Sequence, residues 1–161
     1  MKTRFDFLRE MYFPGYMVLL TEDYDKRRAV FDFKPTEPPV FRSAHYLTPR
    51  GSHIFISQAG LCLVENVIAE EGFDMSVEDY RNLTMEGRMK IVELNQRYRK
   101  EMSLGRDLQG VVNLTNIRWG KLPMVKIDFD IGEHAITGNL IGVLAPRPRP
   151  QMNADIIVNN H

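Results

Sequence analysis

The segment His53-Ile-Phe-Ile-Ser-Gln-Ala-Gly-Leu-Cys-Leu-Val-Glu-Asn-Val-Ile68 sets the architecture of this chain. Residues 59 to 64 carry no polar side chain, so a helix formed here is apolar on nearly every side and is expected to be enclosed by protein. Glu65 and Asn66 lie on the same helix, and a carboxylate in such surroundings is costly unless it is paired or used in chemistry. We expect the helix to run from about residue 54 to 70 and to end at Gly72.

The composition indicates one domain with balanced charge. The chain has 161 residues, and its 21 basic and 21 acidic side chains cancel, which argues against a nucleic acid or an anionic membrane as partner. The N-terminus alternates charged and apolar residues, so we expect no signal peptide, no membrane-spanning segment and a cytoplasmic location. We expect a single domain over residues 1–146 and a flexible proline-rich tail over residues 147–161.

The segments before the apolar helix predict a short helix and a β-hairpin. Residues 4–12 are amphipathic, and Phe13-Pro14-Gly15 then ends the helix. Two runs rich in aromatic and branched residues, Tyr16–Thr21 and Ala29–Phe33, flank the turn-like segment Glu22–Lys26 and indicate two strands. Residues 40–47 are expected to be extended and to lead towards the helix.

The segments after the apolar helix predict a second short helix and then strands. Ser76-Val-Glu-Asp79 matches a capping box, and we expect a strand from about residue 90. Three β-rich runs follow at residues 108–118, 124–131 and 135–144, with short loops that favour antiparallel pairing. The whole pattern predicts an α+β domain in which a curved antiparallel sheet surrounds one helix. Its open edge predicts a homodimer or a higher oligomer.

The apolar helix carries several candidates for chemistry. Gln58 and Glu65 are seven residues apart and are expected to share one stripe of the helix, roughly 10 Å apart. Ser57 and the amides near residues 55 to 58 are expected at the helix N-terminus, where free N–H groups stabilise a carbonyl or an oxyanion. Glu65 is a candidate general acid or base. The alternatives are that Ser57 only caps the helix and that Glu65 and Asn66 cap a subunit contact or pair with an arginine from the sheet.

Two histidines flank the loop that leads into the helix. His45 or His53 is placed to act as a general base, and the alternative is a structural role for both. Their spacing is not a zinc signature and no nucleotide-binding motif is present, so we expect neither a metal nor a cofactor. A basic cluster of Arg97, Arg99 and Lys100 suits the phosphates of coenzyme A or an acidic carrier protein, or else it only keeps a strand edge soluble.

From residue 44 to 146 the chain resembles the FcoT-like hotdog proteins, a family first described as long-chain acyl-CoA thioesterases. The resemblance implies a hotdog fold, acyl-CoA or acyl carrier protein substrates, and a place in lipid or natural-product metabolism. The motifs that carry it, in order, are Ala44-His-Tyr46, His53 with Leu61-Cys-Leu63, Ser76-Val-Glu-Asp-Tyr80, Arg97-Tyr-Arg-Lys100, Asn116-Ile-Arg-Trp-Gly-Lys-Leu-Pro-Met-Val125 and Gly138-Asn-Leu-Ile-Gly-Val-Leu-Ala145.

The resemblance leaves the reaction open. Related proteins add glycine across a 2-enoyl thioester, and hotdog dehydratases carry a catalytic glutamate at a place comparable to Glu65. We expect an enzyme that hydrolyses a fatty acyl thioester, with dehydration or conjugate addition as alternative reactions and a non-catalytic acyl-binding module as the alternative class. In this hypothesis Glu65 and His53, ahead of His45, move the proton. A buried tunnel ending at Glu65 would separate this enzyme from the binding module, and the enzyme hypothesis fails if the helix N-terminus is plugged by side chains and no such tunnel exists. The side chains expected to contact substrate or water are Tyr46, Ser57, Gln58 and Asn66.

Overall fold

The computed structural model describes residues 4–35 and 46–145, which form a curved antiparallel sheet around one long helix, α2 (Pro49–Glu71). Six strands follow one another across the sheet in the order β1-β2-β4-β5-β6-β3. The strands are β1 (Leu19–Asp25), β2 (Arg28–Phe33), β3 (Met89–Tyr98), β4 (Leu108–Arg118), β5 (Met124–Ile131) and β6 (Ile136–Leu144).

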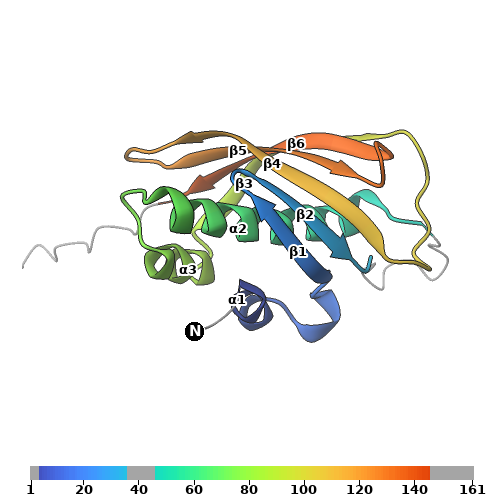
Figure 1. The fold of residues 1–161 in the computed structure, drawn as a ribbon, viewed down its shortest axis with the longest axis horizontal. Coiled ribbons are helices and arrows are strands. Elements are labelled where there is room, and N and C mark those ends of the chain that lie inside the picture. The colour runs from blue at the N-terminus through green and yellow to red at the C-terminus, as the bar shows by residue number, and fades with distance from the viewer. Residues whose placement is uncertain (1–3, 36–45, 146–161) are drawn as a thin grey trace, which may run out of the picture.

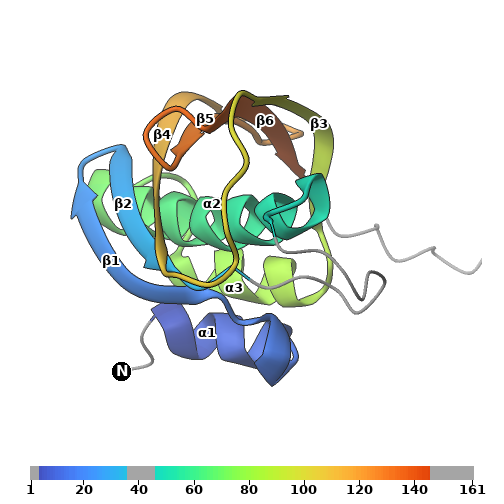
Figure 2. The same ribbon diagram turned by 90° about the vertical axis from the view of Figure 1, so that its right-hand side faces the viewer.

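The sheet covers one side of α2, and two short helices cover the other side. Helices α1 (Arg4–Met11) and α3 (Val77–Met85) lie below α2 in Figure 1, opposite the sheet. Figure 2 shows the sheet curling round α2, with β1 and β2 on one side and β3 on the other. This is the predicted α+β hotdog fold, and the prediction is confirmed.

The sheet meets α2 through alternating side chains. Burial alternates along β5, because successive side chains of a strand point to opposite faces. The inward residues pair across strands, with Ile127 opposite Leu140 and Val125 opposite Gly142. Successive pairs of this kind form a roof over α2.

Helix α2 begins earlier than predicted. The Thr48 hydroxyl accepts a hydrogen bond from the Gly51 amide, and Pro49 occupies the first helical position, where a missing N–H costs nothing. The predicted start near residue 54 is therefore more than one turn late. The predicted end is confirmed, because Gly72 adopts the left-handed conformation, with φ of 65°, that closes a helix.

Helix α2 is the core helix of the domain. By length and composition it is apolar enough to cross a membrane, contrary to the expectation that no segment is, but 72% of its most apolar window is buried inside the structure. Phe55 stacks on Phe33 of β2, with 4.1 Å between the ring centroids. Gly110 of β4 makes room for the Phe55 ring, since a Cβ at that position would collide with it.

The remaining elements agree with the sequence in most places. The sequence predicts the hairpin turn at Glu22–Lys26, but Glu22 to Asp25 belong to β1 and the chain reverses at Lys26, whose φ is 54°. The Ser76 capping box is confirmed, since the Ser76 hydroxyl accepts from the Asp79 amide at 3.0 Å. The strands predicted from residue 90 onward are confirmed. Most of the segment 40–47 and the tail 147–161 lie outside the described residues.

Candidate active site

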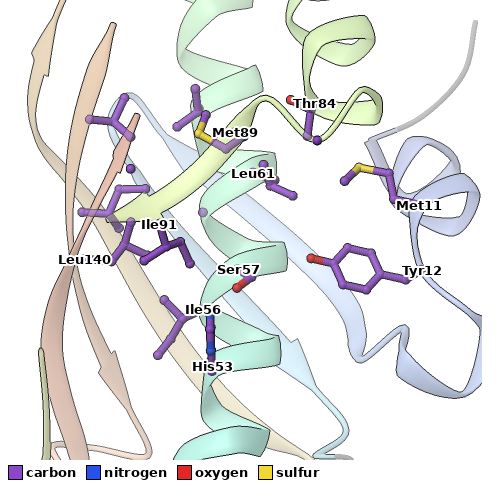
Figure 3. A pocket seen from close by; sticks show the side chains of 16 residues that line it. Met11, Tyr12, His53, Ile56, Ser57, Leu61, Thr84, Met89, Ile91 and Leu140 are labelled. Carbon is purple, nitrogen blue, oxygen red and sulfur yellow. The ribbon is translucent and has the colours of Figure 1, made fainter. Parts of the chain in front are cut away.

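An apolar cavity of about 420 Å³ runs along α2 beneath the sheet. Its floor is α2, its roof comes from β3, β5 and β6, and its sides come from the ends of α1 and α3 (Figure 3). A concave, mostly apolar space with a few polar groups is the usual form of a small-molecule site. The cavity is therefore the candidate active site.

The cavity has a polar end and an apolar end. His53 and Ser57 line it from successive turns of α2, since residues four apart lie one above the other on a helix. Tyr12 follows α1, and its hydroxyl points toward α2 at Ser57 (Figure 3). Further along α2 the lining residues are Leu61 and Val64. This division suits a ligand with a polar reactive group and a long apolar chain.

Protonation favours His53 as a base and Tyr12 as a donor. Partial burial lowers the pKa of His53 below its ordinary value of 6.5, so the imidazole is neutral at neutral pH. Burial raises the pKa of the Tyr12 phenol, so its hydroxyl keeps its proton. His134 lies instead in the exposed turn between β5 and β6, where it pairs with Asp130.

Glu65 is buried and ion-paired. Arg81 of α3 donates to both carboxylate oxygens, from Nε at 2.9 Å and from Nη2 at 2.7 Å, and this bond raises the pKa of Arg81. Arg4 of α1 places its Nε 3.9 Å from Oε1 of the same carboxylate. The predicted tunnel ending at Glu65 is wrong, because the cavity is lined by Val64 and not by Glu65. The proton-transfer role of Glu65 stays a prediction.

The cluster around Glu65 joins α1 and α3 to α2. Arg4 also donates to Asn66 Oδ1 at 2.7 Å, and the Arg81 guanidinium lies over the Phe7 ring of α1. Asn66 therefore faces this cluster and does not line the cavity. The cluster therefore holds together the helices whose ends form walls of the cavity.

Gln58 is fully buried and holds the chain that precedes β1. Its side-chain oxygen accepts from the Val18 amide at 3.0 Å, and its Nε2 donates to the Tyr16 carbonyl at 2.6 Å. The seven-residue spacing from Glu65 thus does not bring the two side chains into one site. Substrate contact by Gln58 and Asn66 stays a prediction.

The start of α2 changes the environment of Ser57. Since the helix begins at Pro49, Ser57 lies more than two turns inside it, and the amides of residues 55 to 58 are bonded within the helix. The prediction that these amides are free at a helix N-terminus is therefore wrong. Tyr46 forms an isolated bridge with Ser103 and does not line the cavity, while His45 lies outside the described residues.

The basic cluster lies outside the cavity, close to the start of α2. Arg97, Arg99 and Lys100 are exposed at the end of β3. Ser52 of α2 contacts both Gln96 and Tyr98, at 3.1 and 2.5 Å from its hydroxyl, so those two side chains point inward. Strand alternation then places Arg97 on the outer face of the sheet.

Sequence reasoning missed the cavity walls that come from distant elements. Tyr12, Thr84, Met89 and Gly142 line the cavity together with α2. They are brought together by the packing of α1, α3 and the sheet, and no local pattern marks them. The spaced glycines of β6 were the one available signal, since glycine in a strand often marks a close approach. Within residues 4–35 and 46–145, no three His, Cys, Asp or Glu side chains are grouped to hold a metal ion.

Comparison with solved structures addresses the fold. A structure described as a hypothetical thioesterase protein with coenzyme A, from Streptococcus pneumoniae TIGR4, matches with a TM-score of 0.57 and 9% identity, over 91% of this chain and 100% of that one. A putative thioesterase from Shewanella oneidensis matches with a TM-score of 0.54 and 12% identity, over 80% and 82% of the two chains. The S. sahachiroi AziG structure matches with a TM-score of 0.52 and 10% identity, over 79% and 90%.

The sequence itself matches no family model and no curated protein. At 9 to 12% identity the structural matches speak for the fold alone. The chain therefore has the hotdog fold, shared with structures described as thioesterases.

Proposed function

We propose that this protein is a cytoplasmic enzyme that hydrolyses fatty acyl-CoA thioesters. The observation that carries the proposal is the cavity along α2, with His53, Ser57 and Tyr12 at one end and Leu61 and Val64 at the other. An acyl thioester divides in the same way, into a polar carbonyl and an apolar chain. The fold shared with structures described as thioesterases supports the same reaction class.

The proposed reaction uses water as the nucleophile. Neutral His53 takes a proton from a water molecule while that water attacks the carbonyl carbon of the thioester. The carbon–sulfur bond then breaks, and the departing thiolate takes the proton from the imidazolium. The products are a carboxylic acid and a free thiol. The hydroxyls of Tyr12 and Ser57 donate hydrogen bonds to the carbonyl oxygen, whose negative charge grows in the transition state.

In this proposal Glu65 is a positioning residue. Its carboxylate accepts hydrogen bonds from Arg81 on both oxygens and lies 3.9 Å from Arg4 Nε, which supports a role in holding α3 and α1 against α2. Proton transfer by Glu65 is the competing hypothesis. His45 remains a candidate second base on the loop before α2, and Tyr46 remains a candidate contact for the substrate.

We propose coenzyme A as the carrier of the acyl group. Arg97 and Arg99 flank Tyr98, whose hydroxyl lies 2.5 Å from Ser52 Oγ, and Ser52 precedes His53. These exposed guanidinium groups and Lys100 lie outside the cavity, at the end of the strand that contacts the start of α2, and suit phosphate oxygens there. The S. pneumoniae structure, which is described with coenzyme A, supports this choice. An acyl carrier protein is the alternative carrier.

We further propose that two copies pair through β3. Within residues 4–35 and 46–145 this strand stands at the end of the sheet order, with β6 as its neighbour, and Val92 on it is 59% exposed. A strand at the end of a sheet is a template for another strand. Light scattering is expected to give the mass of a dimer. A monomeric mass that persists at high concentration would contradict this pairing.

The decisive experiment offers the protein three kinds of acyl thioester. Saturated, 2-enoyl and 3-hydroxyacyl chains on coenzyme A and on a carrier protein are incubated with and without glycine, and the products are separated by mass. The proposal expects free acid and free thiol from saturated acyl-CoA. Water loss from the 3-hydroxyacyl chain, or a glycine adduct of the 2-enoyl chain, would replace hydrolysis with a lyase reaction. Tight binding without turnover would leave an acyl-binding module.

A further inference from the structure

The apolar end of the cavity is closed by a thin wall of side chains. Beyond the wall lies a second, smaller void of about 10 Å³. Both spaces are lined by Val64, Met89, Val125 and Gly142. These four residues therefore separate the cavity from the void.

The order of strand pairs shows that the two spaces lie end to end along α2. The pair Ile127–Leu140 roofs the cavity, and the next inward pair is Val125–Gly142. The pair after that brings Leu144 of β6 opposite Met89 of β3, and Leu144 lines the void but not the cavity. On α2 the same direction leads from His53 to Val64. An extended chain whose thioester lies at His53 therefore points at this wall.

Two glycines keep the cavity open on this path. Gly60 lies on α2 and Gly142 on β6, so the floor and the roof each lack a side chain. A Cβ at Gly60 would lie 3.3 Å from Ile127 Cδ1. A Cβ at Gly142 would lie 3.2 Å from Val125 Cγ2 and 3.5 Å from Met89 Sδ. Added side chains at these points would fill space that a ligand otherwise occupies.

Met89 is the adaptable part of the wall. It is only partly buried and stands at the first position of β3, where Figure 3 shows its side chain between the strand and α2. Methionine has three rotatable side-chain bonds and fills irregular gaps. Truncating it would join the cavity to the void lined by Tyr80 and Trp119.

We propose that Met89 and Val64 set the upper limit on the length of the acyl chain, while Gly142 keeps the space in front of them open. This rests on the proposed function of the same cavity. The enzyme is then selective for acyl chains that end at Met89. Longer chains bind poorly, because their last carbons collide with the side chains of Met89 and Val64. Each carbon of mismatch in an apolar site is worth about tenfold in kcat/KM.

The test compares three variants on a series of saturated acyl-CoA thioesters from butanoyl to palmitoyl. Met89→Ala is expected to raise kcat/KM about tenfold or more for chains longer than the wild-type optimum, relative to chains at that optimum. Gly142→Ala is expected to move the optimum toward shorter chains. Met124→Ala is the matched control, because Met124 lies at the same end of β5 on the outer face of the sheet. Its profile should equal that of the wild type.

A binding measurement keeps the inference separate from the proposed function. Calorimetry with non-hydrolysable acyl-thioether analogues of coenzyme A gives the chain-length limit without turnover. The longest acyl chain that binds should increase in Met89→Ala and decrease in Gly142→Ala. If it does so but no thioester is hydrolysed, the chain-length limit is supported and the hydrolase proposal fails. If thioesters are hydrolysed but the chain-length profile is unchanged in both variants, these residues do not set the chain-length limit. Val64→Ala replaces Met89→Ala should thermal unfolding show that the latter does not fold.

Discussion

The two halves of α2 use their polar side chains differently. In the C-terminal half, Glu65 and Asn66 are held by arginines from α1 and α3. In the N-terminal half, His53 and Ser57 line the cavity, and neither side chain hydrogen-bonds to another residue that the structure describes. His53 is exposed and Ser57 is half-buried, whereas Glu65 and Asn66 are buried. A buried polar side chain therefore does not by itself mark a site on a core helix. What marks it is a polar group left available to a ligand.

The largest expected effect is the loss of His53. His53→Gln should lower kcat/KM about 10²- to 10⁴-fold, because the proposed general base is removed. Thermal unfolding should change little, since the side chain is exposed on one side. His134→Asn is the control, because His134 is 76% exposed in the turn between β5 and β6. Equal activity of the wild type and His53→Gln would remove His53 from the mechanism.

Glu65→Gln tests the opposite half of the helix. Replacing a buried paired carboxylate should lower the free energy of unfolding by about 3 kcal/mol, at the low end for such pairs because the Arg81 side chain is 22% exposed. The kcat/KM of the folded variant should stay within several-fold of the wild type. Glu71 lies on the same helix and forms an exposed ion pair with Arg27, which lies between β1 and β2. Glu71→Gln should therefore lower the free energy of unfolding by less than about 1 kcal/mol. Lost activity with unchanged stability would restore Glu65 as a catalytic acid or base.

Ser57→Ala should have a smaller effect than either of these. The loss of one hydrogen bond to the carbonyl oxygen is expected to lower kcat/KM about tenfold. The KM should change less than kcat, since the bond strengthens as negative charge develops. Stability measured by denaturant unfolding should be unchanged. A variant with full activity would show that Ser57 only lines the cavity.

The pH dependence should give the smallest effect. A general base must be neutral, and burial lowers the pKa of His53 below its ordinary value of 6.5. We therefore expect kcat/KM to be constant near neutral pH and to fall as the pH drops through this lowered pKa. The residual activity of His53→Gln should lack this acid limb. A limb centred above 6.5 would assign the base to a different group.

Much of the fold follows from local patterns in the sequence. The three last strands, the Ser76 cap and the Gly72 stop are set by neighbouring residues, and each was predicted within a residue or two. The start of α2 was missed because Thr48-Pro49 is a short cap signal outside the apolar pattern. The partners of Glu65 were not predictable, because Arg4 and Arg81 reach it only after α1 and α3 have packed.

The site was predictable only in part, because it too depends on contacts between elements that are distant in the chain. The sequence drew attention to His53 and Ser57, which line the cavity, but also to Gln58 and Asn66, which do not. All four lie on a helix that is buried on nearly every face, so the apolar pattern does not indicate which face meets the cavity. Tyr12 and Met89 come from elements far apart in the chain and become neighbours of α2 only in the folded protein.

The two edges of the sheet are chemically unequal, and this limits how copies can assemble. The β1 edge carries Glu22, Asp23 and Asp25, so two such edges would repel each other. The β3 edge has no such run of like charges. Growth of a continuous sheet needs two joinable edges, and of the two edges that the described residues form, only the β3 edge of the proposed dimer lacks this repulsion. Strand pairing between copies should therefore end with a closed, twofold-symmetric pair and should not continue into fibres.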